Sequence, residues 1–285
     1  MTELRSLIGA QSSTASISVE ERLKARRALY ERQAARENAL EGKLNRDGFN
    51  CPVCKNKGYT VYVREQSDGD LEIVQKVCQC WKPRRSIENL QKSGLADVLE
   101  KFTFDNFKTE LDWQKQLLER AKLFRGQKLA HCFFVGGNSG AGKTHICSAL
   151  AIDYLRHGSE VKYVLWRKEV RKIRERIYDK GDEEYLDYLK NVDVLYIDDL
   201  FKSVKREGEA FQRPPTDEGR LAFEIISERL DRDRITIIST ENTLDELIEI
   251  DEAIGTRIKY ESEGFAIAVR RDRKNNYRIT SLGEV

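Results

Sequence analysis

Eight consecutive residues have the types and spacing needed to hold a phosphate group. Residues 137–144 match the pattern Gly-x-x-x-x-Gly-Lys-Ser/Thr in full, between an apolar strand pattern and a helical pattern. Glycines let the backbone wrap a phosphate, and the helix N-terminus adds positive potential. We therefore expect Lys143 to reach the β- and γ-phosphates of a nucleotide and Thr144 to ligate Mg²⁺. The expected nucleotide contacts are Gly137, Asn138, Ser139, Gly140, Ala141, Gly142, Lys143, Thr144, His145 and Asp198.

A second group of polar residues follows two apolar strand patterns. Val194–Ile197 runs directly into Asp198 and Asp199. We expect Asp198 to hold Mg²⁺ and Asp199 to orient or deprotonate the attacking water. The strand pattern at 235–239 leads into Thr240, Glu241 and Asn242, any one of which could contact the γ-phosphate or the water. The spacing leaves the choice among these three open.

Four cysteines form a candidate metal site. They are Cys51, Cys54, Cys78 and Cys80, and they flank two alternating segments joined by a turn pattern. Four thiolates favour tetrahedral Zn²⁺ in a closed, structural site, with an iron–sulfur cluster or free thiols as alternatives. The other two cysteines, at 132 and 147, lie in apolar patterns typical of small core side chains.

Alternating strand and helix patterns indicate how these residues are positioned. The expected strands are Cys132–Val135, Val161–Leu165, Val194–Ile197, Ile235–Ser239 and Phe265–Val269. Helical patterns separate the first four, which predicts an α/β fold with a parallel sheet and helices on both faces.

The length of 285 residues favours two parts. We expect residues 1–17 to be disordered, residues 18–90 to form a helical and zinc-binding module, and residues 91–285 to form the nucleotide-binding domain. A capping-box pattern at 18–21 predicts a charged helix reaching about Leu44. That helix is either simply solvated or docks on a partner.

Composition excludes several classes of protein. Hydrophobic residues make up 40% of the chain, which excludes an intrinsically disordered protein. The 50 Lys and Arg nearly balance 48 Asp and Glu, so nucleic-acid contacts require a local patch. No apolar stretch approaches about 18 residues and no apolar signal core follows Met1, so we expect a cytoplasmic protein with no membrane partner.

Two local basic patches are candidates for nucleic-acid contact. Arg167, Arg171 and Arg174 share one face of an expected helix, where they could contact successive phosphates of single-stranded DNA. A solvated helix with Glu169 and Glu175 is the alternative. A second basic run spans residues 270–274, and the same two interpretations apply to it.

The motifs together resemble the DnaC/DnaI helicase-loader family of AAA+ ATPases, which is similar to the IstB-like transposition ATPases. The resemblance extends from about Phe102 to Ile279, with the cysteine segment as an additional match. The matching segments are Phe133–His145, Val194–Leu200, Thr216–Arg229 and Ser239–Ile258. The resemblance implies ATP and Mg²⁺ as cofactors, a replicative DNA helicase and single-stranded DNA as partners, and ATP hydrolysis coupled to assembly.

The resemblance also implies a role for Arg257. It lies in a Gly-x-Arg element that resembles the family's arginine finger, so it would reach a nucleotide on a neighbouring subunit and require self-assembly. A surface ion pair is the alternative. The chain departs from the AAA+ pattern by ending its Mg²⁺ strand in Asp-Asp rather than Asp-Glu. The segment after Ile258 is too short for a helical lid, as in the family, and Arg278 is the one candidate for the lid's arginine.

These features predict an ATP-dependent helicase loader that delivers a replicative helicase to single-stranded DNA. An IstB-like transposition ATPase is one alternative. A nucleotide-gated adaptor without significant hydrolysis is another, because Asp199 stands where AAA+ proteins commonly have Glu.

Overall fold

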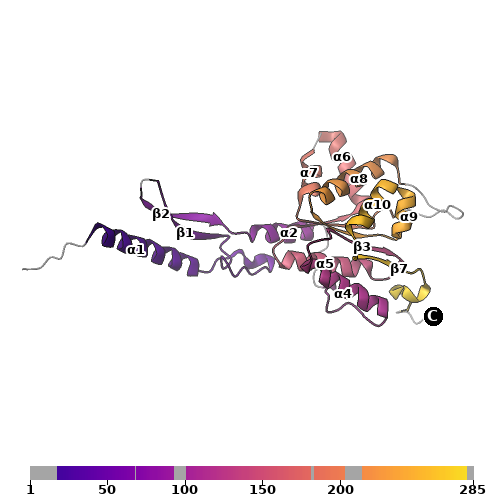
Figure 1. Cartoon of the computed structure of the whole chain (residues 1–285), viewed down its shortest axis with the longest axis horizontal. Helices are drawn as coiled ribbons and strands as arrows, with labels where there is room; N and C mark the ends of the chain where they lie inside the picture. Colours follow the sequence, from indigo (N-terminus) through magenta and orange to yellow (C-terminus); the bar gives the residue numbers. More distant parts are fainter. Residues whose placement is uncertain (1–17, 68, 93–100, 181–182, 203–213, 281–285) are drawn as a thin grey trace, which may run out of the picture. The chain divides into compact units, whose positions relative to one another are not determined.

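The computed structural model describes residues 18–67, 69–92, 101–180, 183–202 and 214–280 (Figure 1). The chain divides into two compact units, residues 1–81 and residues 82–285. The expected disorder of residues 1–17 lies outside the described residues.

The N-terminal unit consists of a helix and a hairpin. Helix α1 (Val19–Ala39) begins at the capping box of Ser18 and Glu21, and strands β1 (Tyr59–Glu65) and β2 (Leu71–Val77) pair antiparallel. Asn38 joins them, because its side chain donates to Val61 O (2.8 Å) and accepts from Val61 N (2.9 Å).

The first helix is shorter than the sequence pattern predicts. It ends at Ala39 rather than near Leu44, and a 3₁₀ turn, η1 (Leu44–Asp47), follows. Gly42 explains the end of the helix: its N–H donates to Lys55 O (2.7 Å), and a Cβ there would collide with the backbone of Asn56. The chain at Gly42 thus lies in close contact with the backbone of residues 55–56, which leaves no room for the helix to continue.

The C-terminal unit is built on a five-stranded parallel sheet, as predicted. Its strands are β3 (Cys132–Gly137), β4 (Val161–Leu165), β5 (Val194–Asp198), β6 (Ile235–Ser239) and β7 (Ala266–Val269). Their order in the sheet is β4-β5-β6-β3-β7. Since β6 lies between β3 and β5, the residues that follow these three strands meet at one edge of the sheet.

Helices cover both faces of this sheet, which confirms the expected α/β class (Figure 1). The connection from β3 to β4 runs toward the β4 edge of the sheet, whereas the later connections run toward the β7 edge. Because such crossovers are right-handed, α5, which follows β3, lies on the opposite face of the sheet from the helices that follow β4, β5 and β6. The helices are α2 (Trp81–Lys92), α4 (Asp112–Gly126), α5 (Lys143–Arg156), α6 (Trp166–Lys180), α7 (Glu183–Asn191), α8 (Thr216–Asp231), α9 (Leu244–Ile250), α10 (Glu252–Glu261) and α11 (Tyr277–Thr280), with a 3₁₀ turn, η2 (Arg273–Asn275). Figure 1 shows α4 and α5 on one face and α6, α8, α9 and α10 on the other.

A fully buried arginine joins α7, α8 and β6. Arg229 donates to the carbonyls of Leu189 (2.8 Å), Val192 (2.8 Å) and Ile235 (2.6 Å), and to Thr236 Oγ1 (3.1 Å). The guanidinium therefore supplies donors to backbone carbonyls near the end of α7, just after it and at the start of β6.

We expect Arg229→Met to lower the free energy of unfolding by about 3 kcal/mol or more. The substitution keeps an unbranched apolar stem but leaves several buried acceptors without a donor, each worth about 1–3 kcal/mol. Urea denaturation followed by circular dichroism measures the change. The control is Arg232→Met at the end of the same helix, an exposed side chain paired with Glu228, which should cost about 1 kcal/mol or less. Equal effects of the two substitutions would contradict this role for Arg229.

Candidate functional site

The predicted phosphate loop joins β3 to α5 at the carboxyl edge of the sheet. Gly137, Gly140 and Gly142 all have positive φ, at 102°, 70° and 82°. A Cβ on Gly137 would collide with Val269 O, and one on Gly140 with the Asn276 side chain. Both the backbone torsions and the close neighbours therefore require glycine here.

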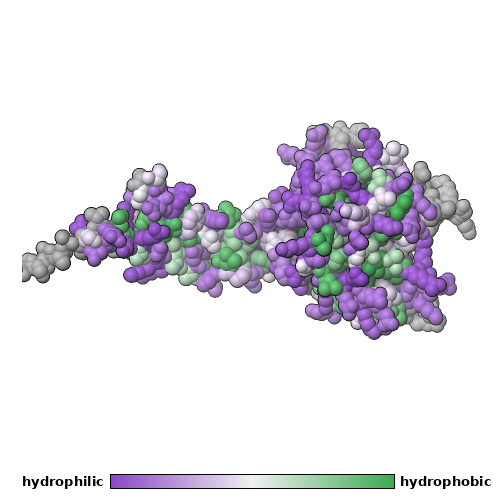
Figure 2. Space-filling model, in the orientation of Figure 1, coloured by the Kyte–Doolittle hydropathy of each residue, from purple (hydrophilic) through white to green (hydrophobic). Residues whose placement is uncertain are grey.

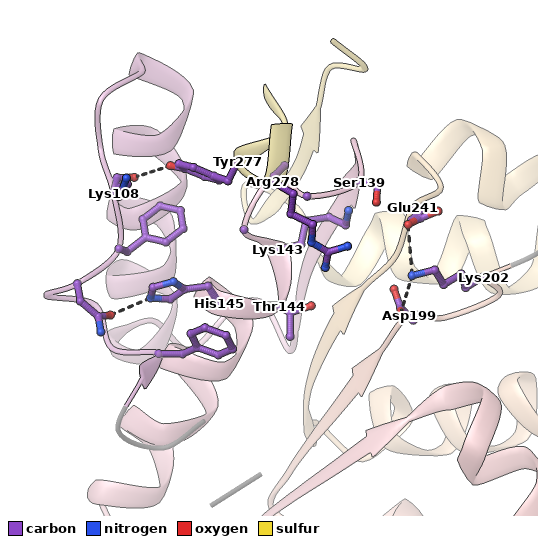
Figure 3. A pocket seen from close by; sticks show the side chains of 16 residues that line it. Lys108, Ser139, Lys143, Thr144, His145, Asp199, Lys202, Glu241, Tyr277 and Arg278 are labelled. Carbon is purple, nitrogen blue, oxygen red and sulfur yellow. Dashed lines mark hydrogen bonds and ion pairs between the residues drawn. The ribbon is translucent and has the colours of Figure 1, made fainter. Parts of the chain in front are cut away.

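The loop borders a cavity of about 490 Å³, shown in Figure 3. Lys143 is buried beside it, and its Nζ donates to Gly137 O (3.0 Å) and Asn138 O (2.7 Å). Burial lowers the pKa of the Lys143 ammonium, and the carboxylates of Glu241 and Asp199 oppose that shift. A bound phosphate would supply the further negative charge that this buried cation lacks.

Asp198 lies at the end of β5, next to the start of α5. Thr144 Oγ1 donates to its carboxylate at 3.2 Å, so the two residues expected to hold Mg²⁺ are brought together. The hydroxyls of Tyr163 (3.1 Å), Tyr196 (2.9 Å) and Ser239 also donate to this carboxylate. Oxygen ligands of this kind suit Mg²⁺.

Asp199 lines the cavity in a left-handed backbone conformation, with φ 57°. Its carboxylate is 3.0 Å from Lys202 Nζ, which also lies 3.3 Å from Glu241 (Figure 3). Lys202 was not among the site residues predicted from the sequence. Its position just after the Asp-Asp strand end was the available signal, but nothing local indicates that the chain turns its ammonium back onto Asp199.

The three residues left open after β6 have different positions. Glu241 lines the cavity beside Lys202. Asn242 lines an adjacent cavity of about 260 Å³, and its amide donates to Phe201 O (3.2 Å). Thr240 is buried and donates to Leu200 O (2.6 Å). Of the three, Glu241 is thus the side chain that faces the larger cavity.

An aromatic wall closes the cavity beyond the loop. Phe102 stacks on His145 with ring centroids 4.7 Å apart, and Phe107 meets the same imidazole edge-on at 5.2 Å. His145 Nε2 lies 3.0 Å from Thr103 O and 2.9 Å from Asn106 Oδ1. Both partners are acceptors, so Nε2 carries the hydrogen. Burial lowers the pKa of this imidazole, which favours the neutral ring.

The C-terminal segment is fastened to the phosphate loop. Tyr277 N donates to Gly140 O (3.0 Å), and Trp113 Nε1 donates to Asn275 Oδ1 (3.1 Å). Arg278 then extends into the cavity toward Lys143 and Thr144 (Figure 3). Within the described part of the chain, its guanidinium has no ion-pair partner.

Arg257 is not part of this cavity. It lies on α10, where Nη1 is 2.7 Å from Asp231 Oδ1 and 3.3 Å from Ser227 O. The structure therefore gives this arginine an ion pair within its own chain, and its action on a neighbouring subunit stays a prediction.

The predicted basic face of α6 is partly neutralised. Arg167 and Arg171 are exposed, whereas Arg174 lies 2.7 Å from Asp217 on α8. Val170 and Ile173, three residues apart and therefore on one side of the helix, are both buried. In the second basic run, Arg271 forms an ion pair with Glu246.

The four predicted cysteines of the N-terminal unit converge. All four are buried, and their sulfur atoms lie within 4.8 Å of one another. The Sγ–Sγ distances are 3.7 Å for Cys51–Cys78 and 3.6 Å for Cys54–Cys80. Tetrahedral Zn²⁺ with Zn–S bonds of about 2.3 Å requires sulfurs about 3.8 Å apart. The Gly58 N–H also points at Cys54 Sγ (3.3 Å), so the donor set fits a closed zinc site.

Comparison with known proteins identifies the family. Residues 67–258 match the model of the IstB-like ATP binding protein family, and the chain belongs to it. The C-terminal unit is thus an AAA+ domain of an ATP-binding family. Within the described residues, no helix is long and apolar enough to cross a membrane.

Individual relatives are distant. The chain is 26% identical to protein YqaM of Bacillus subtilis (strain 168), with 93% of this chain and 94% of YqaM covered. It is 29% identical to the phage-like element PBSX protein XkdC of the same organism, with 74% and 78% covered. A match to the replicative helicase loader DnaC of Buchnera aphidicola subsp. Acyrthosiphon pisum (strain APS), at 27% identity, covers 39% of this chain and 47% of that protein.

A solved structure of the DnaC helicase loader shares the fold. The match has a TM-score of 0.50 at 17% identity and covers 61% of this chain and 98% of that one. The family match and these similarities together confirm the resemblance to the DnaC/DnaI and IstB-like ATPases.

We expect Lys143→Ala to weaken ATP binding by on the order of tenfold or more. The charge-assisted contacts that the ammonium offers a phosphate are worth about 1.5–3 kcal/mol. Titration with a fluorescent ATP analogue measures the affinity, and circular dichroism tests the fold. The control is Lys115→Ala, an exposed lysine on α4 outside the cavity. Unchanged affinity in a folded Lys143→Ala protein would exclude this lysine from the binding site.

We expect about one Zn²⁺ per chain, lost on Cys54→Ser and retained on Cys132→Ala, which changes a buried cysteine outside the cluster. Chelation should unfold the N-terminal unit and leave the C-terminal unit folded, because the small unit depends on its metal. Elemental analysis with circular dichroism measures both. Iron with visible absorbance, or no metal in freshly purified protein, would contradict the zinc assignment.

Proposed function

We propose that this protein is an ATP-dependent helicase loader, which binds a replicative DNA helicase and delivers it to single-stranded DNA. The observation that carries the proposal is the cavity lined by residues 139–144 and Asp199, with buried Asp198 bonded to Thr144, in an IstB-like domain. A separate unit with a cysteine cluster precedes that domain. The similarity to the DnaC helicase loader supports the helicase as partner.

ATP would lie with its phosphates against residues 137–144 and its base against the aromatic wall of Phe102, Phe107 and His145. Lys143 and Arg278 are placed to neutralise phosphate charge from two sides. Thr144 and Asp198 would hold Mg²⁺, which when bound offsets the charge of the phosphates.

The proposed role of Asp199, which lines the cavity, is to orient or deprotonate the attacking water. Its carboxylate is held by Lys202, so this ion pair must loosen before Asp199 can contact a water molecule. A terminal phosphate would give the Lys202 ammonium another anion to pair with in place of Asp199. Nucleotide binding would thereby release Asp199 for its role.

The N-terminal unit is the proposed helicase-binding part, corresponding to the module expected at residues 18–90. Its hairpin exposes apolar side chains, among them Tyr62, Ile73 and Val77, which is 68% exposed. Figure 2 shows green, hydrophobic surface on this unit among hydrophilic side chains. By the strand pairing, Ile73 and Val77 share one face of the hairpin and Tyr62 lies on the other, and exposed apolar side chains are a feature of protein-binding surfaces.

Two alternatives have an observation in their favour. The family's IstB name favours a transposition ATPase. The Asp199–Lys202 pair favours a nucleotide-gated adaptor without significant hydrolysis. Co-purification with the helicase or the transposase of the same host tests the first distinction, and ATP turnover tests the second. Capture of the helicase in an ATP-dependent manner supports the loader, whereas capture of the transposase alone contradicts it.

We expect the Arg257→Ala protein to bind ATP with nearly unchanged affinity. Its rate of ATP hydrolysis should fall by on the order of 10³-fold if the arginine acts on the nucleotide of a neighbouring subunit. Mixing it with Lys143→Ala should restore some turnover, because mixed interfaces pair an intact cavity with an intact arginine. Phosphate release at concentrations where the protein assembles measures this.

The matched control is Asp231→Asn, which breaks the same intrachain ion pair and keeps the arginine. That pair is half exposed and should contribute at most about 1 kcal/mol to folding. If both substitutions changed hydrolysis equally, Arg257 would be a surface ion-pair residue and not a finger.

A further inference from the structure

A second cavity of the C-terminal unit, of about 430 Å³, has a different chemistry. It shares no lining residue with the nucleotide cavity. Its walls come from α2, from the edge strand β4, and from α6 and α7. The lining residues are Arg85, Lys162, Lys172, Arg176, Glu184, Tyr185 and Tyr188.

Positive charge dominates this lining, with four cationic side chains against one carboxylate. Two further carboxylates lie behind it. Glu169 is buried, accepts from the Tyr185 hydroxyl and lies 3.4 Å from Lys172, while Glu160 lies 3.8 Å from Arg85. Neither of these two lines the cavity.

Cationic side chains of this cavity lie against the rings of Tyr185 and Tyr188. The Arg176 guanidinium lies 4.5 Å from the Tyr185 ring centroid, and the Arg85 guanidinium 5.5 Å from that of Tyr188. Lys162 lies 6.0 Å from the Tyr185 ring. Each ring face attracts a cation, so like charges stay close together at reduced cost.

Mutual repulsion nevertheless remains within this group. Burial lowers the pKa of Lys162, and the charges of Lys172 and Arg176 lower it further, against the opposing effect of Glu169. An anion in the cavity would relieve this repulsion. Arginine and lysine donors that converge from several elements suit the several oxygens of a phosphate group.

We propose that this cavity binds a phosphate group, supplied either by the phosphodiester backbone of single-stranded DNA or by a free phosphorylated ligand. The site lies on a different face of α6 from Arg167 and Arg171. The first source would deepen the proposed function by giving its DNA partner a binding site. The second would be independent of that function.

The test compares two double substitutions. Lys172→Gln/Arg176→Gln removes two cations from the cavity, and Lys115→Gln/Lys122→Gln removes two exposed cations from α4, which contributes no residue to the cavity. Fluorescence anisotropy with labelled oligothymidylate at several salt concentrations measures binding to the full chain. We expect the cavity variant to bind on the order of tenfold more weakly, and its salt slope to fall by about 1 for each phosphate that is no longer neutralised. The control variant should bind like the original chain.

A second arm tests the free-ligand source. Inorganic pyrophosphate is titrated calorimetrically into the Lys143→Ala protein, whose phosphate loop is disabled, with and without the cavity substitutions. Binding that disappears only with those substitutions supports a free phosphorylated ligand. Lys172→Arg/Arg176→Lys, which retains both charges, should retain binding in the responsive arm.

The proposal is overturned if the two double substitutions affect oligothymidylate equally and pyrophosphate binding does not depend on the cavity. Helicase capture and ATP affinity are measured separately, so that outcome leaves the loader proposal standing. Conversely, failure to capture a helicase does not alter either binding result.

Discussion

One buried carboxylate organises the site. Asp198 receives hydrogen bonds from hydroxyls on α5, β4, β5 and β6, so a charge that would otherwise be costly inside the protein is stabilised by four elements. Burial and this carboxylate raise the pKa of Tyr163 and Tyr196, which keeps both hydroxyls protonated as donors. Because Thr144 is among the donors, the same interaction fixes where α5 begins. The position of the phosphate loop, and of the cavity beside it, follows from satisfying Asp198.

The sequence predicted the parts of this arrangement that depend on local pattern. The phosphate loop, the Asp-Asp strand end and the cysteine pairs each lie within a few residues, and apolar runs located all five strands of the parallel sheet. Helix α1 was predicted too long because the contact that ends it, between Gly42 and the Lys55–Asn56 backbone, joins residues outside any helical period. Motifs made of neighbouring residues can be predicted from a sequence. The end of a helix that is set by a steric contact with a separate loop cannot.

The cavity walls were harder to predict for the same reason. Phe102, Lys202 and Tyr277 reach the nucleotide cavity from segments far apart in the sequence, and no periodicity relates them. The basic helix shows the limit most clearly. Helical spacing correctly separated a buried face from charged faces, but it could not show that Asp217 neutralises Arg174. Helical spacing also could not show that Lys172 and Arg176 line the second cavity together with Lys162 and Arg85. That arrangement depends on the position of β4 at the edge of the sheet.

The attachment of the C-terminal segment to the phosphate loop has a consequence for biosynthesis. Only glycine at position 140 leaves room for the Asn276 side chain, Tyr277 N donates to the Gly140 carbonyl, and Arg278 lines the cavity. The ribosome makes the loop more than a hundred residues before it makes these three partners. A nascent chain therefore carries a phosphate loop without these contacts until residues 276–278 have emerged. The loop can therefore reach its supported conformation only late in synthesis, after residue 278 has been made.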